Sequence, residues 1–462
     1  MHCKKDFVFM KKIAFSGAAG NGISPLEQIM SLKGYQVYGS DYSFDIGKDL
    51  DRKQALEEVG VHIVPQDGSA ITDDVEFLCV SAAINESNPD IKAALTKNIP
   101  IKKRSDLLQE IFSQYKYGIA VGGTAGKTTT TAMIGYVLDV LGKKPCMING
   151  GALCNFSDRK GIPNYIYNEG DYCVIEADES DGSIRKYHPF VGIVNNISHD
   201  HTSMEKLFEY FSTFASHAQN LVINLDCPNA SQLSHPHRKT FSTQNPQADI
   251  YASNIKTVAD GITYDLEGKT FRLQLIGAFN VANALATIAA CSLVGIAPQE
   301  TARALEGFTG IKVRLEKIGT AKGVTVYNDF AHNPSKIEAS LSALKDYPGR
   351  IIAMYQPHTP FSAVNTGDEV AAAVAKVLSP EDVMIMQEIY ELTPQDVGIT
   401  SLNIINRIKE NGHQKALFLP HKEDTRKFVL ENVRQGDRVV IMGAHDNSLA
   451  DFSRELLKAI GA

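Results

Sequence analysis

A glycine-rich run that ends in lysine and threonine is the part of the chain best suited to chemistry. Residues 122–129 read GGTAGKTT and lie between an apolar run typical of a strand (117–123) and an amphipathic run typical of a helix (128–144). Small residues at such a junction let backbone N–H groups surround a phosphate, while the lysine and threonine supply a positive charge and a hydroxyl for Mg²⁺. The pattern favours a nucleoside triphosphate site over a solvated turn, although Val121 stands where the formal G-x-x-x-x-G-K-[ST] motif has glycine. The residues expected to form the site are Gly123, Thr124, Ala125, Gly126, Lys127, Thr128 and Thr129.

Acidic residues follow a later strand-like run of the same region. Residues 176–181 read EADESD, and Glu176 comes directly after the apolar run 172–175, where a strand delivers it to the carboxyl edge of a sheet. An acidic cluster alone is typical of a solvated loop, but beside a phosphate loop it favours metal binding. A further strand ends in NNISHDH at 195–201, which places more polar ligands at that edge. Zn²⁺ is an alternative for these histidines, yet no cysteine or further histidine lies nearby at ligand spacing, so Mg²⁺ with oxygen and imidazole ligands is preferred.

A second glycine loop follows the first strand-like run of the chain. Gly17, Gly20 and Gly22 are spaced G-x-x-G-x-G, which departs from the dinucleotide fingerprint G-x-G-x-x-G. Asp41 ends the next strand-like run, where a carboxylate can bind a ribose. The loop indicates a nucleotide or diphosphate at a helix start, with an NAD-dependent oxidoreductase and a plain tight turn as open alternatives.

The composition narrows the class of protein. The chain has 462 residues, of which 44% are hydrophobic and 21% charged, values that exclude a disordered or collagen-like chain. No run approaches the ~18 apolar residues of a membrane span. The formal net charge of −7 gives no reason to expect nucleic acid or an anionic membrane as a partner. The seven scattered cysteines, without a C-x-x-C motif, are typical of reduced thiols, so we expect a cytoplasmic protein.

Alternating strand-like and helical runs must position these residues, and the alternation occurs in three successive blocks. It is typical of βαβ units and mostly parallel sheets. We therefore expect an α/β fold of three consecutive domains, which are a Rossmann-like N-terminal domain (1–115), a P-loop ATPase domain (116–310) and a Rossmann-like C-terminal domain (311–462). The expected strands are residues 12–17, 35–41 and 75–84 in the first block, 117–123, 171–178, 190–197 and 221–226 in the second, and 324–331, 350–356, 381–386 and 438–443 in the third.

Taken together, these motifs resemble those of the Mur ligase family, the ATP-dependent amino-acid ligases of peptidoglycan synthesis, over nearly the whole chain. Residues 123–131 match the family's phosphate loop G-T-x-G-K-T-T-T-T, with Ala125 where the alanine-adding branch usually has histidine. EADESD is similar to the family's acidic metal motif, and NNISHDH is similar to its second metal motif, in which His201 matches the histidine that binds Mg²⁺. The metal ligands implied by the resemblance are Thr128, Glu176 and His201.

The resemblance continues through an adenine motif into the third block. GAFN at 277–280, followed by NALA at 283–286, resembles G-x-H-N-x-x-N-A-L-A with Phe279 in place of histidine, which implies that Asn280 and Asn283 contact adenine. RLE at 314–316 is similar to R-R-F-E, which implies that Arg314 reaches the phosphates of ATP when the domains close.

Two motifs of the third block imply the site for the incoming amine. NDFAHNP at 328–334 is similar to D-D-Y-A-H-x-P, which implies that Asp329 lies near the ribose and that His332 orients the amine or accepts its proton. QPH at 356–358 resembles the alanine-adding branch and implies a substrate contact from His358. That branch continues with arginines, whereas this chain continues with TPF at 359–361.

In the first block, the resemblance implies a domain that binds the UDP group of an acceptor. The match includes GSD at 39–41, SAAI at 81–84 and NP at 88–89. The alanine-adding branch normally has a different glycine loop. The residues expected to bind the acceptor in this block are Gly17, Gly20, Asn21, Gly22, Ser40, Asp41, Ser81 and Ala82.

The family's chemistry sets the expected function. The resemblance implies an ATP- and Mg²⁺-dependent ligase, a monomer or homodimer, that joins an amino acid, L-alanine before others, to the carboxylate of UDP-N-acetylmuramate through an acyl phosphate. The catalytic residues that it implies are Lys127, Glu176, His201, Arg314 and His332. The alternatives are a relative that adds a peptide during murein recycling, a ligase with another acceptor, and a nucleotide-binding regulator without catalysis.

Overall fold

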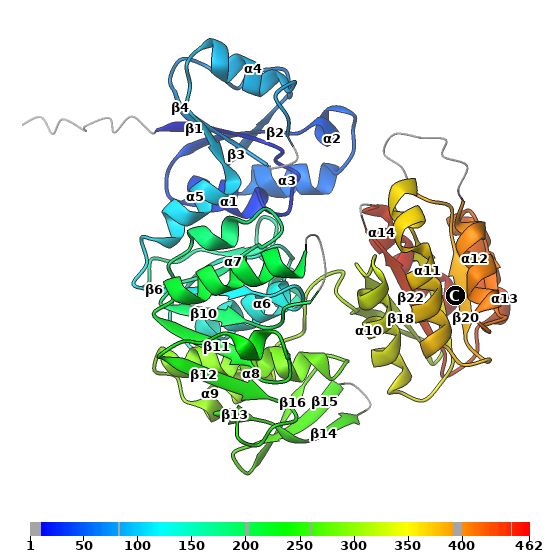
Figure 1. Ribbon diagram of the computed structural model, residues 1–462. Helices are drawn as coiled ribbons and strands as arrows, with labels where there is room; N and C mark the ends of the chain where they lie inside the picture. Colours follow the sequence, from blue (N-terminus) through cyan, green and yellow to red (C-terminus); the bar gives the residue numbers. More distant parts are fainter. Residues whose placement is uncertain (1–10, 82–83, 199–202, 259–260, 391–399, 445) are drawn as a thin grey trace, which may run out of the picture. The chain divides into compact units, whose positions relative to one another are not determined.

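The computed structural model describes residues 11–81, 84–198, 203–258, 261–390, 400–444 and 446–462 (Figure 1). Contacts within the chain divide it into two compact units. The first unit contains Met1–Asn254, Tyr264–Phe271 and Asn280–Thr309, and the second contains Ile255–Thr263, Arg272–Phe279 and Gly310–Ala462. Within the described ranges, none of the helices has the length and apolar character needed to cross a bilayer.

The first domain, drawn in blue in Figure 1, is built on a five-stranded sheet. Its elements are β1 (Lys12–Ser16), α1 (Ser24–Leu32), β2 (Gln36–Ser40), α2 (Tyr42–Asp45), α3 (Leu50–Glu58), β3 (Val61–Val64), β4 (Val75–Val80), α4 (Pro89–Thr96), β5 (Ile101–Lys103) and α5 (Arg104–Phe112). All strand pairs are parallel, in the order β3-β2-β1-β4-β5. The central strand β1 is buried on both faces, because Ile13 and Phe15 pack with α1 while Ala14 packs with α4.

The central domain also belongs to the first unit. Its elements are β6 (Tyr117–Gly122), α6 (Lys127–Val140), β7 (Cys146–Ile148), η1 (Cys154–Phe156), β8 (Tyr165–Ile166), β9 (Tyr172–Glu176), η2 (Ser183–Lys186), β10 (Val191–Val194), α7 (Met204–His217), β11 (Asn220–Asn224), η3 (Ala230–Gln232), β12 (Arg238–Ser242), β13 (Ile250–Tyr251), α8 (Phe279–Leu293) and α9 (Pro298–Leu305). The eight strands are ordered β13-β12-β11-β10-β6-β9-β7-β8, and every pair except β7–β8 is parallel. Since β9 and β10 flank β6, the carboxyl ends of these three strands share one edge. A separate three-stranded sheet consists of β14 (Ser253–Val258), β15 (Gly261–Leu266) and β16 (Lys269–Leu273).

The third domain forms most of the second unit. Its elements are β17 (Glu316–Ala321), β18 (Val324–Asp329), α10 (Pro334–Lys345), β19 (Ile351–Gln356), α11 (Pro360–Val377), β20 (Val383–Met386), α12 (Ser401–Glu410), β21 (Ala416–Phe418), α13 (Lys422–Asn432), β22 (Arg438–Gly443) and α14 (Ser448–Gly461). The strand order is β17-β18-β22-β19-β20-β21, with only the β17–β18 pair antiparallel. Along β19, Ile352 and Met354 join the core against α13 and α14, while Ala353 and Tyr355 join the core against α10, α11 and α12. This alternation explains the unbroken apolar strand sequence, because both faces are covered.

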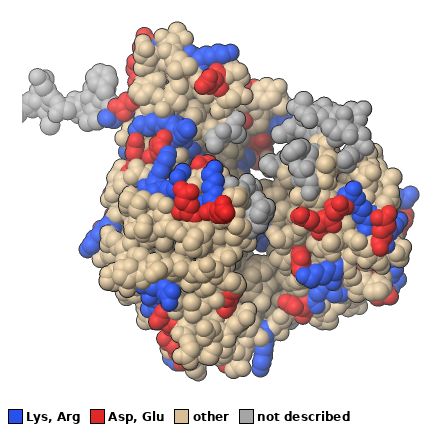
Figure 2. Space-filling view, in the orientation of Figure 1, with Lys and Arg blue, Asp and Glu red and all other residues tan. Residues whose placement is uncertain are grey.

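These three domains confirm the predicted α/β architecture and the strands expected at the polar loops. On the face drawn in Figure 2, basic and acidic side chains are interspersed, in keeping with surface ion pairs such as Lys102–Glu110 and Lys186–Asp106.

A carboxyl group buried in the first domain sets a testable pH dependence of stability. Glu27 on α1 is 0% exposed, and among the residues that the structure describes neither of its carboxyl oxygens has a hydrogen-bond partner, although Arg52 lies near enough to exert a favourable charge. Burial, with a smaller contribution from Asp41, raises the pKa of Glu27 well above its ordinary value of 4.5. The folded state therefore retains a proton on Glu27 that the unfolded state releases above about pH 4.5. Because of this difference, Glu27 lowers the free energy of unfolding increasingly as the pH rises above about 4.5.

We expect Glu27→Met to stabilise the protein at pH 7.5 by roughly 1–3 kcal/mol, because the variant removes a buried polar group without partners. The melting temperature should rise relative to wild type at pH 7.5, and the difference should shrink at pH 4.5. Glu57→Met, an exposed change on α3, is the matched control and should have little effect at either pH. An equal shift of the Glu27→Met variant at both pH values would contradict the assignment of a titrating carboxyl.

Candidate functional site

The phosphate loop lies at the carboxyl edge of the central sheet, between β6 and α6. Gly123 and Gly126 have φ angles of 138° and 82°, which lie in the region that favours glycine. A Cβ atom at Gly126 would lie 2.5 Å from the Oδ1 atom of Asn283, so this position also lacks space for a side chain. The loop therefore requires glycine for two independent reasons, as its sequence suggested.

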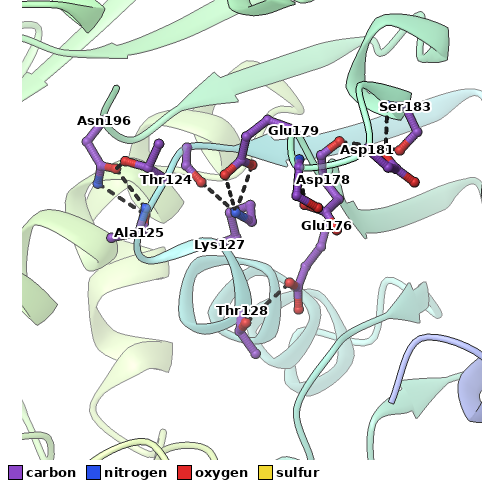
Figure 3. A network of polar contacts seen from close by, with 12 residues as sticks. Thr124, Ala125, Lys127, Thr128, Glu176, Asp178, Glu179, Asp181, Ser183 and Asn196 are labelled. Carbon is purple, nitrogen blue, oxygen red and sulfur yellow. Dashed lines mark hydrogen bonds and ion pairs between the residues drawn. The ribbon is translucent and has the colours of Figure 1, made fainter. Parts of the chain in front are cut away.

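Lys127 begins α6 and forms a buried ion pair with Glu179 (Figure 3). Its Nζ atom donates to the two carboxylate oxygens of Glu179 at 3.0 and 2.8 Å and to the carbonyl oxygen of Gly123 at 2.8 Å. The side chains of Lys127 and Glu179 are 17% and 2% exposed. Burial alone would lower the pKa of Lys127, but the neighbouring carboxylates, Glu179 before the others, outweigh it and keep the lysine charged. Glu179 was not among the predicted site residues.

Thr128 and Glu176 supply oxygen atoms beside this lysine. The Thr128 hydroxyl donates to Oε2 of Glu176 at 3.2 Å, and the Gly150 N–H donates to Oε1 at 2.5 Å. Val121 of β6 is in register with Glu176 of β9, so the parallel pairing of these strands brings the two motifs together. Hydroxyl and carboxylate oxygens are the ligand types that Mg²⁺ prefers.

The residues that follow β10, the third strand at this edge, also contact the phosphate loop. After β10, the side chain of Asn196 pairs with the backbone of Ala125: its Oδ1 accepts the Ala125 N–H at 2.8 Å and its Nδ2 donates to the Ala125 carbonyl at 3.1 Å. The same Oδ1 accepts the Thr124 hydroxyl at 2.8 Å. His201, predicted as a metal ligand, lies outside the described residues.

The asparagines predicted to contact adenine form a network with the helix that follows the phosphate loop. Asn283 accepts a hydrogen bond from the hydroxyl of Thr130 at 3.3 Å and donates to Asn280 at 3.1 Å. Asn195 in turn donates to Thr130 at 2.9 Å. The network is buried and links α8, α6 and the end of β10. Thr129 lies half-buried in the first turn of α6.

The first domain's glycine loop is held by Asp41. The Asp41 carboxylate accepts the N–H groups of Ala19, inside the loop, and of Ser43, at the start of α2. Gly17 has a φ angle of 92°, and a Cβ there would lie 3.2 Å from the Cβ of Ser81. Asp41 thus shapes the loop directly, while its contact with a ribose stays a prediction.

Other residues predicted to bind the acceptor substrate lie near the ends of β1 and β2. The Gly20 N–H donates to the Gly17 carbonyl at 2.9 Å, which closes the turn that continues through residues 21–22. Ser40 is buried, and its hydroxyl lies within hydrogen-bond distance of the Asp90 carboxylate and of the carbonyl of Phe15. Ala82 lies outside the described residues.

In the second unit, Asp329 at the end of β18 contacts the turn that contains Arg314. Asp329 is 6% exposed, and its carboxylate accepts hydrogen bonds from the N–H of Leu315 at 3.0 Å and from the hydroxyl of Ser340. Burial raises its pKa above the ordinary value. The guanidinium of Arg314 lies 4.5 Å from the ring centre of Phe330, and Leu315 has a φ angle of 47°. Asp329 therefore stabilises the turn that presents Arg314.

His332 and His358 lie together in the second unit, with ring centres 5.3 Å apart. Nδ1 of His332 is 2.8 Å from the carbonyl of Phe330, which only accepts, so Nδ1 carries the proton and Nε2 is left as an acceptor. Burial, reinforced by the charge of Lys336, lowers the pKa of His332 to about 3. The ring is neutral at pH 7, which suits it to orienting an amine rather than to titrating near neutrality.

Comparison with known proteins places this geometry in a family. Family models match residues 12–116 (Mur ligase family, catalytic domain), 121–291 (Mur ligase middle domain) and 313–445 (Mur ligase, glutamate ligase domain). The UDP-N-acetylmuramate–L-alanine ligase of Rhizobium etli is 31% identical over 97% of this chain and 96% of its own length. The ligase of the same name from Brucella anthropi is 32% identical over 94% of both chains.

Solved structures agree with the sequence relatives. The crystal structure of the UDP-N-acetylmuramate–alanine ligase MurC from Thermotoga maritima has a TM-score of 0.81 at 25% identity and covers 97% of this chain and 98% of its own. A murein peptide ligase from Psychrobacter arcticus shares the fold, with a TM-score of 0.68 at 22% identity over 98% and 99% of the two chains. With matching models for all three domains and relatives above 30% identity along nearly its whole length, the chain belongs to the Mur ligase family.

Proposed function

We propose that this protein is an ATP-dependent ligase that joins L-alanine to the carboxylate of UDP-N-acetylmuramate, with release of ADP and phosphate, in peptidoglycan synthesis. The observation that carries the proposal is the end-to-end match to relatives of that name, at 31% identity over 97% of the chain for one of them. The match spans the predicted acceptor, ATP and amine domains. The cysteines that the structure describes form no disulfide bonds, which supports a cytoplasmic location for this reaction.

ATP fits the phosphate loop. Gly123 and Gly126 give the loop the backbone shape that phosphate loops need, and Lys127 is the cation at the start of α6, where helix N–H groups favour phosphate. In the described structure Glu179 holds this cation. The terminal phosphates of ATP would therefore compete with Glu179 for Lys127.

Mg²⁺ fits the oxygen pair beside the loop. Thr128 and Glu176 lie 3.2 Å apart at the edge where the phosphates would lie. No group of three or more histidine, cysteine or acidic residues arranged to hold a metal occurs within the described ranges. A hydroxyl and a carboxylate beside a phosphate site suit Mg²⁺, which is usually held by one or two carboxylates together with substrate phosphates. When bound, the ion would neutralise charge on the transferring phosphoryl group.

The chemistry proceeds in two steps. A carboxylate oxygen of the acceptor attacks the γ-phosphorus of ATP, the bond to the bridging oxygen breaks, and ADP leaves. The amine then attacks the carbonyl carbon of the acyl phosphate, a proton is lost from nitrogen, and phosphate departs. Lys127 stabilises the negative charge that builds up in the first step, and Nε2 of His332 accepts a hydrogen bond from the amine in the second.

Phosphate release by the purified protein tests this function. The assay contains Mg²⁺-ATP, UDP-N-acetylmuramate and a panel of single amino acids, and each component is omitted in turn. We expect release to require both UDP-N-acetylmuramate and L-alanine.

A second arm replaces L-alanine with the peptide L-alanyl-γ-D-glutamyl-meso-diaminopimelate, because the residues after QPH depart from the alanine-adding branch. Release with this peptide but with no single amino acid would replace the proposal by a peptide-adding ligase. Absence of release in both arms would contradict both readings.

A further inference from the structure

Two cysteines of the central domain lie side by side in its sheet and have no part in the site described above. Cys146 on β7 and Cys173 on β9 are partners in the parallel register of these strands, which places their Cα atoms one strand spacing apart, about 4.8 Å. Both side chains point to the same face of the sheet, because each joins the core that also contains Ile148 and Ile175, two residues further along the strands. The two thiols are therefore neighbours.

This arrangement suits a disulfide bond between the two strands. Bonded cysteines usually have Cα atoms about 4.4–6.8 Å apart and side chains that point to a common side. In this structure the described cysteines are free thiols. Disulfide bonds of proteins in a reducing compartment are usually transient and serve in catalysis or redox sensing. The pair therefore has the geometry for a bond that forms only under oxidation.

The surroundings of the pair favour Cys146 as the nucleophile. Hydrogen bonds from Cys173 and Tyr115 outweigh burial and lower the pKa of Cys146, whereas burial raises the pKa of Cys173 well above its ordinary value. The positive charge of Lys33 favours the thiolate form of both residues. Because the thiolate is the reactive form of cysteine, Cys146 is the residue of the pair that an oxidant meets first.

The cover over the thiols admits only a small oxidant. Both cysteines are 0% exposed, and the half-buried rings of Tyr115 and Tyr167 pack against the same core. Next to Tyr115 in the chain, Gln114 accepts a hydrogen bond from Lys33 at 2.9 Å, and both residues line a surface pocket. Hydrogen peroxide is little larger than water, so it is the class of oxidant suited to passing these side chains.

The same two strands carry a predicted Mg²⁺ ligand and its hydrogen-bond partner. β9 ends at Glu176, three residues after Cys173, and Gly150 follows β7, four residues after Cys146. The Gly150 N–H donates to Oε1 of Glu176 at 2.5 Å. A disulfide bond holds its sulfur atoms about 2 Å apart, closer than two thiols in contact, so it would draw the strands together. The change in strand spacing would reach the Glu176 carboxylate along both strands.

We propose that Cys146 and Cys173 form a reversible disulfide bond when peroxide oxidises them, and that this bond weakens the binding of Mg²⁺-ATP, an inference that rests on the ATP site of the proposed function. The thiolate sulfur of Cys146 attacks one oxygen of hydrogen peroxide, the O–O bond breaks, and the leaving hydroxide takes the proton that Cys146 released. The sulfur of Cys173 then attacks the sulfenic acid, the S–O bond breaks, and the departing oxygen leaves with the thiol proton as water. Two thiols are oxidised to one disulfide, and one peroxide is reduced to two waters.

Peptide mass spectrometry and calorimetry test the two parts of this proposal on the full chain. The protein is treated with hydrogen peroxide, then with catalase and N-ethylmaleimide, and digested. We expect a pair of peptides joined through Cys146 and Cys173 that separates after treatment with dithiothreitol. Calorimetric titration with a non-hydrolysable ATP analogue and Mg²⁺ should show roughly tenfold weaker binding after oxidation, the loss typical when the partners of a metal ligand are disturbed. Dithiothreitol should restore the binding.

Alanine variants assign the effect to this pair. Cys173→Ala lacks one partner, so its affinity for the ATP analogue should be the same before and after peroxide. Cys146→Ala removes the other partner and replaces the first variant if the melting curve shows that Cys173→Ala does not fold. Cys291→Ala is the matched control, because Cys291 is also 0% exposed in the central domain but lies on α8. It should respond to peroxide as wild type does.

Each other outcome overturns a part of the proposal. Absence of the joined peptides even when other cysteines are oxidised would refute the disulfide bond. A disulfide that leaves the affinity unchanged would refute its effect on the ATP site, and weaker binding that persists in Cys173→Ala would place that effect on another residue. Wild-type protein that binds no ATP analogue before oxidation would refute the ATP site of the proposed function together with the coupling, whereas failure of the disulfide alone leaves that function standing.

Discussion

Replacing Lys127 with methionine is expected to reduce the rate of ligation by about a hundred- to a thousandfold, because the variant lacks the cation that stabilises charge on the transferring phosphoryl group. The same change leaves the buried Glu179 without its partner, and breaking a buried ion pair in this way costs about 3–5 kcal/mol. Turnover at saturating substrates and the free energy of unfolding in urea measure the two effects.

The double variant Lys127→Met, Glu179→Gln separates catalysis from folding. It removes both charges, so the stability should return close to that of wild type while ligation stays as slow as in the single variant. If the double variant regains turnover together with stability, Lys127 acts only through the fold. Near-normal turnover in the single variant would contradict the phosphate site itself.

The Glu176→Gln variant is expected to lower kcat by roughly a hundred- to a thousandfold and to raise the Mg²⁺ concentration needed for half-maximal rate. The amide preserves the shape of the side chain and can still pair with the Thr128 hydroxyl and the Gly150 N–H, so the loop should keep its structure. What is lost is the negative charge that attracts the cation. The Mg²⁺ dependence of the initial rate measures this loss.

A control for Glu176 lies in the same acidic motif. Asp181 is exposed, and its carboxylate accepts the N–H of Ser183 at 2.8 Å (Figure 3). The Asp181→Asn change therefore removes a charge from the loop without touching the Thr128–Glu176 pair. It should leave the Mg²⁺ requirement unchanged, and an equal shift in both variants would show that only the general charge of the loop matters.

The fold was largely predictable because the sheets are buried on both faces. Apolar runs such as 350–356 and 438–443 have no helical period, and the structure confirms them as β19 and β22. Strands with mixed sequence were missed. RKTFS of β12 and VHIV of β3 contain polar residues that suit a sheet only because of neighbours distant in the sequence.

The candidate site was predictable as motifs but not as contacts. Position after a strand located Glu176, since the carboxyl ends of neighbouring parallel strands meet at one edge. The same argument did not reveal which carboxylate of EADESD faces Lys127, because the pairing with Glu179 depends on the path of the loop after β9. The hydrogen bonds between Asn196 and Ala125 join residues 71 positions apart, so they too depend on the tertiary fold.

Asp41 and Asp329 show a related limit of sequence reasoning. Both were expected to lie near a ribose, and in the described structure both carboxylates accept backbone N–H groups of loops in their own domains. A carboxylate at a strand end can accept hydrogen bonds either from the N–H groups of a loop or from the hydroxyls of a ligand. Residue type and position therefore do not separate the two roles.

Oxygen transfer from the acceptor to phosphate tests the central claim most directly. UDP-N-acetylmuramate labelled with ¹⁸O in both carboxylate oxygens is incubated with the protein, Mg²⁺-ATP and L-alanine, and the phosphate and the nucleotide product are analysed by mass spectrometry. Attack of the carboxylate on the γ-phosphorus predicts one ¹⁸O in each released phosphate, the other ¹⁸O in the new amide, and a product heavier by one alanine residue. Unlabelled phosphate, or ATP cleavage without an alanine adduct, would contradict the account.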